Sequence, residues 1–215
     1  MKLVKSLAAL TLVAGVFAQT ANATTFADEK FRFDANLGFK VSHFSVKDSS
    51  TNYNPGSFQL NLSGHYFFFN NDKVAVGGGL EVGGSVGTYT VGSTNNHYYS
   101  STYESTDERT GSRRFTDYNA GLSLLTQFRI ENSGFVPYAQ FSVGYQVADL
   151  RNTRSSADRS FKYKGVYVKL GGGVSWSNGF TAGVYVSYAP NMKSDEVVET
   201  KASNKVVGAQ FGWKF

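Results

Sequence analysis

Apolar and polar residues alternate one by one along eight segments of this chain, most clearly in the last one. Residues 205–215 read KVVGAQFGWKF, and every second residue is apolar: Val207, Ala209, Phe211, Trp213 and Phe215. A period of two gives a β-strand one apolar and one polar face. The same alternation predicts seven further strands, at about 31–44, 58–69, 74–91, 115–130, 135–148, 161–176 and 180–189.

The connections between these predicted strands alternate in length. Three are tight turns rich in Asn and Gly, at 70–73, 131–134 and 177–179. The other four are long, polar and charged, at about 45–57, 92–114, 149–160 and 190–204. Strict alternation is typical of an up-and-down barrel with short periplasmic turns and long extracellular loops. We therefore predict an all-β fold, an eight-stranded antiparallel up-and-down transmembrane β-barrel, with both termini on the periplasmic side.

Aromatic residues gather at the ends of the predicted strands. Near the short turns and the C-terminus lie Phe68, Phe69, Phe128, Phe135, Trp176, Phe180, Trp213 and Phe215. Near the long loops lie Phe44, Phe58, Tyr89, Tyr118, Tyr145 and Tyr188. Two such bands predict the aromatic girdles of a membrane barrel, whose apolar outer face is in contact with lipid. The competing fold is a periplasmic lipocalin-like barrel, which would place its apolar face inside.

The first 23 residues have the pattern of a secretory signal peptide. Lys2 and Lys5 precede an apolar run, and residues 21–23 read ANA, a small-x-small cleavage site. We predict a signal peptide at 1–23 and an outer-membrane β-barrel domain at 24–215, exported through the periplasm. Removing two lysines lowers the formal charge from +5 to +3, which does not favour nucleic acid as a partner. The chain has no cysteine, which excludes disulfides and thiolate metal sites.

With these features the chain resembles the small eight-stranded outer-membrane β-barrels of Gram-negative bacteria, the opacity-type and outer-membrane-protein-A-like porin family. The resemblance is one of pattern over 24–215, and only the terminal FGWKF is close to a motif. In that family such an ending is the signal for the outer-membrane assembly machinery, which implies this role for Phe211, Trp213 and Phe215. Members include adhesins, structural proteins, narrow channels and a few lipid enzymes, so the family does not determine an activity.

Charged residues lie on the polar faces of the predicted strands, which point into the barrel: Arg32, Asp34, Lys40, Glu81, Asp117, Arg129, Lys169 and Lys214. An eight-stranded barrel is just wide enough inside for side chains to fill it, and buried charges must pair. We expect Glu81 to pair with one of three residues, Lys169, Lys40 or Arg129. We expect Asp34 to be the counter-charge of Lys214. This network either plugs the barrel or lines a narrow, gated ion path.

One string resembles a catalytic motif. Residues 83–87 read GGSVG and match the G-x-S-x-G nucleophile pattern, which works only at a sharp strand-to-helix turn. Here the string lies within a predicted strand. Glycines crowd segments 77–87 and 171–173, and we expect them to let the barrel curve and to make room for Tyr and Arg side chains inside.

The histidines also give no metal-binding pattern. His43, His65 and His97 lack metal-ligand spacing, and no H-E-x-x-H string occurs. His43, Ser42 and Asp34 come nearest to a triad, but neighbouring residues on a strand point to opposite faces. We therefore predict no catalytic residue, no metal site and no cofactor.

The long loops carry the main functional hypothesis. Loop 92–114 mixes Tyr, Ser and both charges, a composition typical of recognition surfaces. Basic residues gather at the outer rim, and the candidates for contact with lipopolysaccharide phosphates are Arg113, Arg114, Lys162 and Lys164. We predict a non-enzymatic surface antigen for envelope structure or for adhesion, whose partners are outer-membrane lipid, the assembly machinery and an extracellular ligand. The alternatives are a narrow porin-like channel and, third, a lipid-modifying enzyme.

Overall fold

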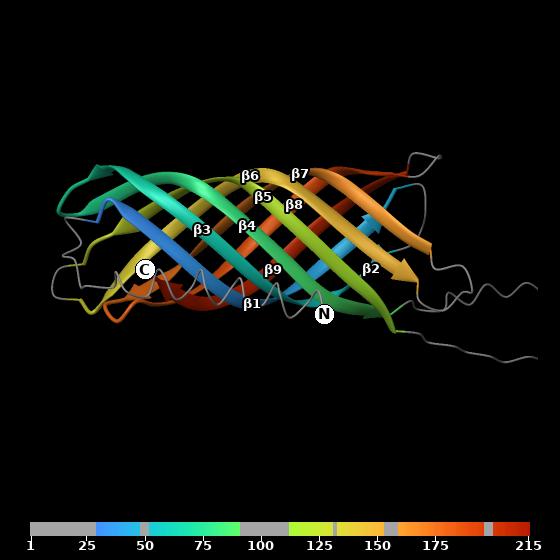
Figure 1. The fold of residues 1–215 in the computed structure, drawn as a ribbon, viewed down its shortest axis with the longest axis horizontal. Coiled ribbons are helices and arrows are strands. Elements are labelled where there is room, and N and C mark those ends of the chain that lie inside the picture. Colours follow the sequence, from blue (N-terminus) through green and yellow to red (C-terminus); the bar gives the residue numbers. More distant parts are fainter. Residues whose placement is uncertain (1–28, 48–51, 91–111, 131–132, 153–158, 196–199) are drawn as a thin grey trace, which may run out of the picture.

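The computed structural model of the chain is a closed antiparallel β-barrel (Figure 1). It describes residues 29–47, 52–90, 112–130, 133–152, 159–195 and 200–215. Eight long strands form the wall: β1 (Phe31–Val46), β3 (Gly56–Asn70), β4 (Val74–Thr90), β5 (Ser112–Phe128), β6 (Phe135–Asn152), β7 (Arg159–Trp176), β8 (Phe180–Ser194) and β9 (Lys201–Lys214). Each pairs with the next, and β9 pairs with β1 to close the barrel. The predicted eight-stranded antiparallel fold is therefore confirmed.

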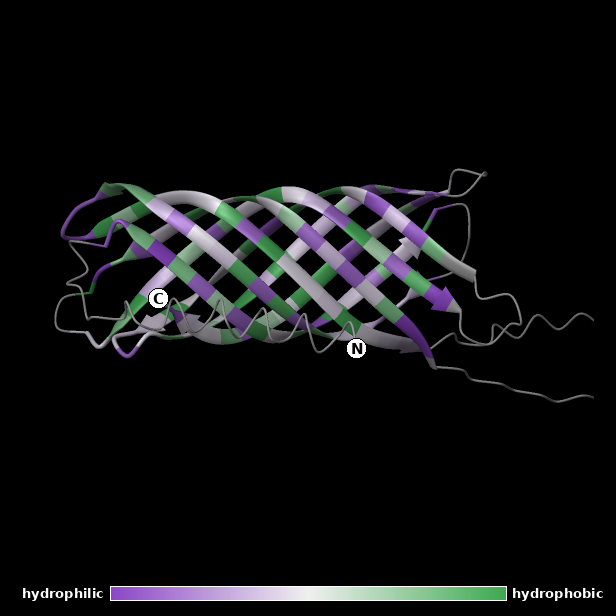
Figure 2. Cartoon of the chain, in the orientation of Figure 1, coloured by the Kyte–Doolittle hydropathy of each residue, from purple (hydrophilic) through white to green (hydrophobic). Residues whose placement is uncertain are grey.

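The alternation of apolar and polar residues becomes an alternation of outside and inside. Leu37 and Phe39 on β1 are exposed on the outer surface, whereas Asn36 and Lys40 are buried in the lumen. Figure 2 shows the same change from green to purple along the strands. An apolar outside and a polar inside are what a membrane barrel requires, and they are the reverse of a lipocalin-like barrel. The lipocalin-like alternative is therefore excluded.

The wall extends further on the side of the long loops than the alternation predicts. β6 continues to Asn152, β8 continues to Ser194, and β9 already begins at Lys201. A two-residue strand, β2 (Asn52–Tyr53), pairs with the end of β1 inside the connection predicted at 45–57. These extensions carry polar residues on their outer face. Strand pairing therefore continues there although the sequence no longer alternates between apolar and polar residues, which is the pattern that predicts a strand.

The two ends of the barrel differ in their connections. Short turns gather at the end where β9 finishes, which we call the short-turn end, and the opposite end is the loop end (Figure 1). Predictions that fall on the signal peptide, on His97 and on most of loop 92–114 lie outside the described residues. Within the described part of the chain, no helix is long and apolar enough to cross a membrane.

The predicted aromatic band at the loop end needs a correction. Phe58, Tyr118, Tyr145 and Tyr188 are exposed on the outer surface as expected. Two others of that band, Phe44 and Tyr89, are instead buried inside the lumen. The reason is strand phase: residue 44 falls on the same face of β1 as the buried Ser42 and Lys40.

Candidate functional site in the lumen and at the outer rim

The short-turn end of the lumen is filled by a small apolar cluster beneath an ion pair. Phe67, Ala75, Leu125 and Tyr138 are buried together. The Arg32 guanidinium lies 5.0 Å from the centre of the Tyr138 ring. Its Nη2 donates to Oδ1 of Asp34 at 2.7 Å and its Nε to Oδ2 at 2.8 Å. Because Arg32 and Asp34 are two residues apart on one strand, both point into the barrel.

Glu81 is the centre of a second network near the middle of the lumen. Its carboxylate is 1% exposed and forms an ion pair with Lys169. It also accepts hydrogen bonds from Tyr167 Oη at 2.6 Å and from Gln140 Nε2 at 3.0 Å. Of the three partners predicted for Glu81, the structure brings Lys169 to it. A buried carboxylate with a cation and two further donors has the compensation that burial requires.

A third ion pair joins Lys40 to Asp117. Lys40 Nζ lies 2.8 Å from Oδ1 and 2.6 Å from Oδ2 of Asp117, and both side chains are buried. Lys40 is on β1 and Asp117 on β5, three strands further around the wall. Glu81 and Lys169, on β4 and β7, are separated in the same way. Both pairs therefore cross the lumen instead of following its wall.

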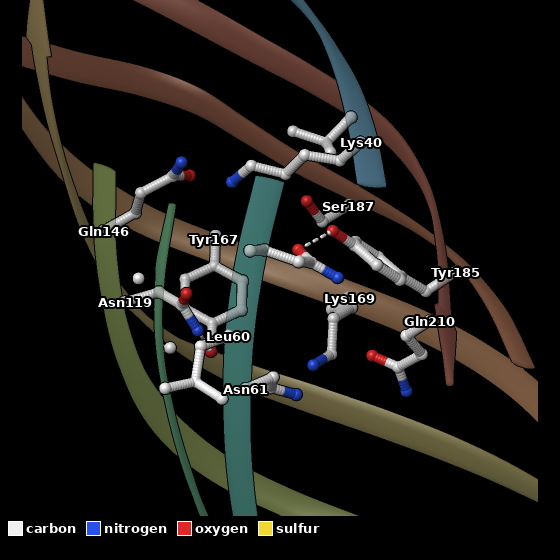
Figure 3. Close-up of a pocket in the computed structure, with 14 residues that line it drawn as sticks. Lys40, Leu60, Asn61, Asn119, Gln146, Tyr167, Lys169, Tyr185, Ser187 and Gln210 are labelled. Carbon is white, nitrogen blue, oxygen red and sulfur yellow. Dashed lines mark hydrogen bonds between the residues drawn. The ribbon is translucent and has the colours of Figure 1, made fainter. Parts of the chain in front are cut away.

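A small cavity lies between these crossing pairs (Figure 3). Its volume is about 30 Å³, and its lining includes both Lys40 and Lys169. Tyr185 Oη donates a hydrogen bond to Gln59 beside it. Such a volume suits about two water molecules and no larger solute. The polar lining is therefore compatible with trapped water.

The loop end of the lumen is filled by a larger cluster that the sequence analysis did not find. It includes these buried apolar residues: Phe44, Tyr89, Phe115, Ala148, Leu150, Tyr163, Tyr167, Ala189, Met192 and Ala202. The Phe44 and Tyr163 rings meet edge to face with centroids 5.1 Å apart, and Tyr53 meets Tyr89 at 5.0 Å. Burial raises the pKa of Tyr53 above its usual range. Strand phase, extended beyond the apolar band, identifies these residues as inward, except for Met192, whose phase is reversed by the shifted pairing of β8.

Two predicted lumen charges lie at the short-turn rim instead of in the central networks. Arg129 Nη2 donates to Asn70 Oδ1 at 3.1 Å, and Lys214 Nζ lies 3.4 Å from Glu29. The predicted pairing of Lys214 with Asp34 is wrong, although the two residues are direct neighbours across β1 and β9. Asp34 is held by Arg32 on its own strand, and the long lysine side chain extends to the rim.

The four candidates for lipopolysaccharide contact do not share one face. Arg114 and Lys162 are exposed on the outer surface, on the strand faces that carry lipid-facing residues. Lys164 also faces outward, and its hydrogen bond with Asp195, at 2.6 Å, raises the lysine pKa. Arg113 follows the inward phase of β5, opposite the buried Tyr89. Only three of the four are therefore positioned to meet lipid.

The catalytic candidates of the described residues lie in three places. Residues 83–87 lie within β4 and not at a strand-to-helix turn. His65 Nε2 lies 2.9 Å from Ser123 Oγ, and both side chains are buried in the lumen. His43 and Ser45 form a His-x-Ser pair on the outward face of β1, where His43 Nδ1 lies 2.7 Å from Asn54 Oδ1 and Ser45 Oγ donates to Asn52 Oδ1. Among the described residues, no cluster of His, Cys, Asp and Glu could hold a metal ion.

A closed barrel with an apolar outside and a filled polar inside is an integral outer-membrane protein. The family model described as the outer membrane protein beta-barrel domain matches residues 8–215. The chain belongs to this family, and its location is the outer membrane of a Gram-negative bacterium.

Several solved structures are similar to this chain. OprG from Pseudomonas aeruginosa is 19% identical, with 86% of this chain and 96% of OprG covered and a TM-score of 0.46. Neisserial surface protein A is 16% identical, with 85% and 96% covered and a TM-score of 0.45. The outer membrane protease OmpT from Escherichia coli is 9% identical, with 89% and 98% covered and a TM-score of 0.42. No match was found among curated proteins. Likenesses this distant do not extend to function.

Proposed function

We propose that the protein is a non-conducting, non-enzymatic outer-membrane barrel that serves envelope structure or surface recognition through its loop end. The observation that carries this proposal is the filling of the lumen at every level. Two ion pairs cross it, and apolar clusters lie on both sides of them. A permeating ion would have to separate buried pairs and pass an aromatic cluster, and each step is costly in a low-dielectric interior.

Planar-bilayer recording of the refolded protein tests this proposal against the channel alternative. We expect no steady single-channel steps, while a water-filled porin refolded in the same way conducts. A variant with Phe44→Ala and Tyr163→Ala opens the loop-end cluster and leaves both crossing ion pairs in place. This variant should also show no single-channel steps if the charge networks close the lumen. Steady steps from the wild-type protein would favour the narrow channel instead.

We also propose Phe211, Trp213 and Phe215 as the signal for the assembly machinery. Phe211 and Trp213 are exposed on the outer face of β9. Phe215 exchanges two backbone hydrogen bonds with Phe33 at the junction of β1 and β9, at 3.1 and 2.8 Å. The Phe211 and Trp213 rings are therefore accessible from the lipid side of the barrel.

Finally, we propose contact between the outer rim and lipopolysaccharide. Arg114, Lys162 and Lys164 support it, because they face outward beyond the lipid-facing apolar residues. Arg113 faces inward and is better placed to hold the inner rim beside Tyr89. Guanidinium and ammonium groups at this height suit phosphate groups of the outer leaflet.

A further inference from the structure

Four lysines lie side by side on the outer face at the loop end. Lys193 on β8 is the direct cross-strand neighbour of Lys164 on β7 and of Lys201 on β9. Lys47, just beyond β1, donates its backbone N–H to the Lys201 carbonyl at 2.7 Å. We call Lys47, Lys164, Lys193 and Lys201 the lysine row. It crosses the seam between β1 and β9, where the barrel closes.

The lysine row begins beside the lipid-facing surface and extends away from it. On β7 the outward residues Val168 and Val166 are followed directly by Lys164. On β9 the exposed Val207 is followed on the same face by Lys205, Ser203 and then Lys201. Headgroup phosphates lie at the height of Lys164 and Lys205, just outside the hydrocarbon.

Outward basic residues at the loop end also occur on β5 and β6, as Arg114 and Arg151, but not at the outward positions Gly56 of β3 and Thr88 of β4. The lysine row differs from these other basic residues because its members follow one another on four adjacent strands.

An irregularity in β8 is what brings its lysine into the row. The pairing of β8 shifts against β9 between Ala189 and Met192, and against β7 between Lys164 and Val168. Below the shift, the even-numbered Tyr188 faces outward; beyond it, the even-numbered Met192 is buried in the lumen and Lys193 faces outward. Without the shift, Lys193 would point into the barrel. Bulges at the rims of barrels, and next to active sites, redirect side chains in this way.

The row places like charges on adjacent strands, and some of its members have partners of their own: Lys164 pairs with Asp195, and Lys47 Nζ donates to Asn191 Oδ1 at 3.0 Å. Like charges directly opposite on neighbouring strands destabilise a sheet. Asp195 pairs with Lys164, and the connecting segment 195–199 (DEVVE) contains three acidic residues in all. Set against the four lysines of the row and Lys205, three acids still leave a positive excess.

We propose that the lysine row binds the headgroup of an outer-leaflet glycolipid that carries two or more phosphates, and that this headgroup clamps β1 to β9. The inference rests on the proposed contact with lipopolysaccharide and assigns that contact to the barrel seam. Two phosphates can bridge ammonium groups on adjacent strands, so the lipid opposes separation of the first strand from the last. A lipid is favoured over a soluble anion because the row adjoins the lipid-facing surface.

The test compares unfolding rates in two bilayers at one urea concentration, followed by tryptophan fluorescence. The bilayers are phosphatidylcholine alone and phosphatidylcholine with bisphosphorylated lipid A. Lipid A should slow unfolding of the wild-type protein at least about tenfold, given about 1 kcal/mol per lysine near an anionic surface. The variant with Lys47→Gln, Lys193→Gln and Lys201→Gln should lose this slowing. In phosphatidylcholine alone it should unfold no faster than the wild type, because its repulsion is relieved.

A control removes exposed positive charge at the opposite, short-turn rim: Lys30→Gln and Lys73→Gln. The control should keep the slowing by lipid A. If the control loses the slowing and the row variant keeps it, the contact lies at the short-turn rim and the seam clamp is wrong. Equal slowing by soluble tripolyphosphate in phosphatidylcholine would overturn the assignment to a lipid. Conductance, which tests the non-conducting barrel, is independent of all these outcomes.

Discussion

At the scale of single residues, the lumen shows how a narrow barrel accommodates charge. Glu81 is held by Lys169, Tyr167 and Gln140, and none of these contacts lies at the surface. A buried pair of this kind adds little net stability over an apolar pair of the same shape. Removing one partner has a different effect, because the remaining charge is left buried without compensation.

Glu81→Ala should therefore lower the free energy of unfolding by about 3–5 kcal/mol, since it leaves the Lys169 ammonium unpaired in the lumen. Urea unfolding in phosphatidylcholine vesicles measures the change. The double variant with Glu81→Gln and Lys169→Met should recover much of the loss. Asp72→Asn is the control: Asp72 is fully exposed, 3.8 Å from Arg129, and its loss should leave the midpoint nearly unchanged. A single variant as stable as the wild type would contradict the buried network.

Gly208 on the inner wall shows that the filled lumen also requires space for its large side chains. A Cβ at Gly208 would lie 2.5 Å from the Tyr185 ring, which crosses the lumen above it. Gly208→Ala should cost about 1–3 kcal/mol of unfolding free energy, because the ring must move in a filled interior. A double-mutant cycle with Tyr185→Leu should show a positive coupling. Gly134→Ala, where a Cβ meets nothing within 4 Å, should have little effect.

At the scale of elements, the closing strand joins the two ends of the chain. β9 pairs with β1 from Asp34↔Lys214 to Val46↔Ala202, and Phe215 adds backbone bonds beyond the strand. Phe215→Ala keeps these backbone bonds and removes only the terminal ring. We expect normal refolding in detergent but a reduced amount of heat-modifiable barrel in cells, measured by gel migration. Trp176→Ala, which removes another ring at the same end, should assemble normally; equal loss in both variants would contradict a specific signal at the C-terminus.

The elements also show how far the sequence could predict this structure. All eight long strands were predictable, because a lipid-facing outside makes every second residue apolar through the membrane. The short strand β2 and the loop-end extensions were not, since their outer residues are polar and alternation disappears there. The reversal of phase at Met192 follows from the shifted pairing of β8, which local sequence does not reveal.

For the lumen charges, too, the sequence predicts one part of the structure and leaves another part open. Their position inside the barrel follows from strand phase alone, as for Lys40 and Glu81. Their partners depend on which strands face each other across the lumen, which requires the stagger of the closed barrel. This is why the sequence leaves three candidate partners for Glu81, and why it predicts Asp34 as the partner of Lys214 where the structure has Glu29.

At the scale of the whole molecule, the interior and the exterior have separate roles. The interior is filled by ion pairs and apolar clusters that hold the wall together. The exterior is an apolar belt with basic residues at the loop end, among them the lysine row. Any partner must therefore bind the apolar belt, the loop-end rim or the long loops. Which partners can reach these surfaces depends on which end of the barrel faces the cell surface.

That orientation gives a direct prediction, because the chain contains no cysteine and each introduced one is unique. Asn191→Cys lies at the loop end and Ser177→Cys in the short turn between β7 and β8, and both positions are exposed. With the short turns in the periplasm, a membrane-impermeant maleimide added to intact cells should label Cys at position 191 and not at position 177. Permeabilised cells, in which both positions become accessible, provide the control. Labelling at 177 alone in intact cells would show that the barrel has the opposite orientation. The lysine row would then not lie in the outer leaflet, where the proposed glycolipid is found.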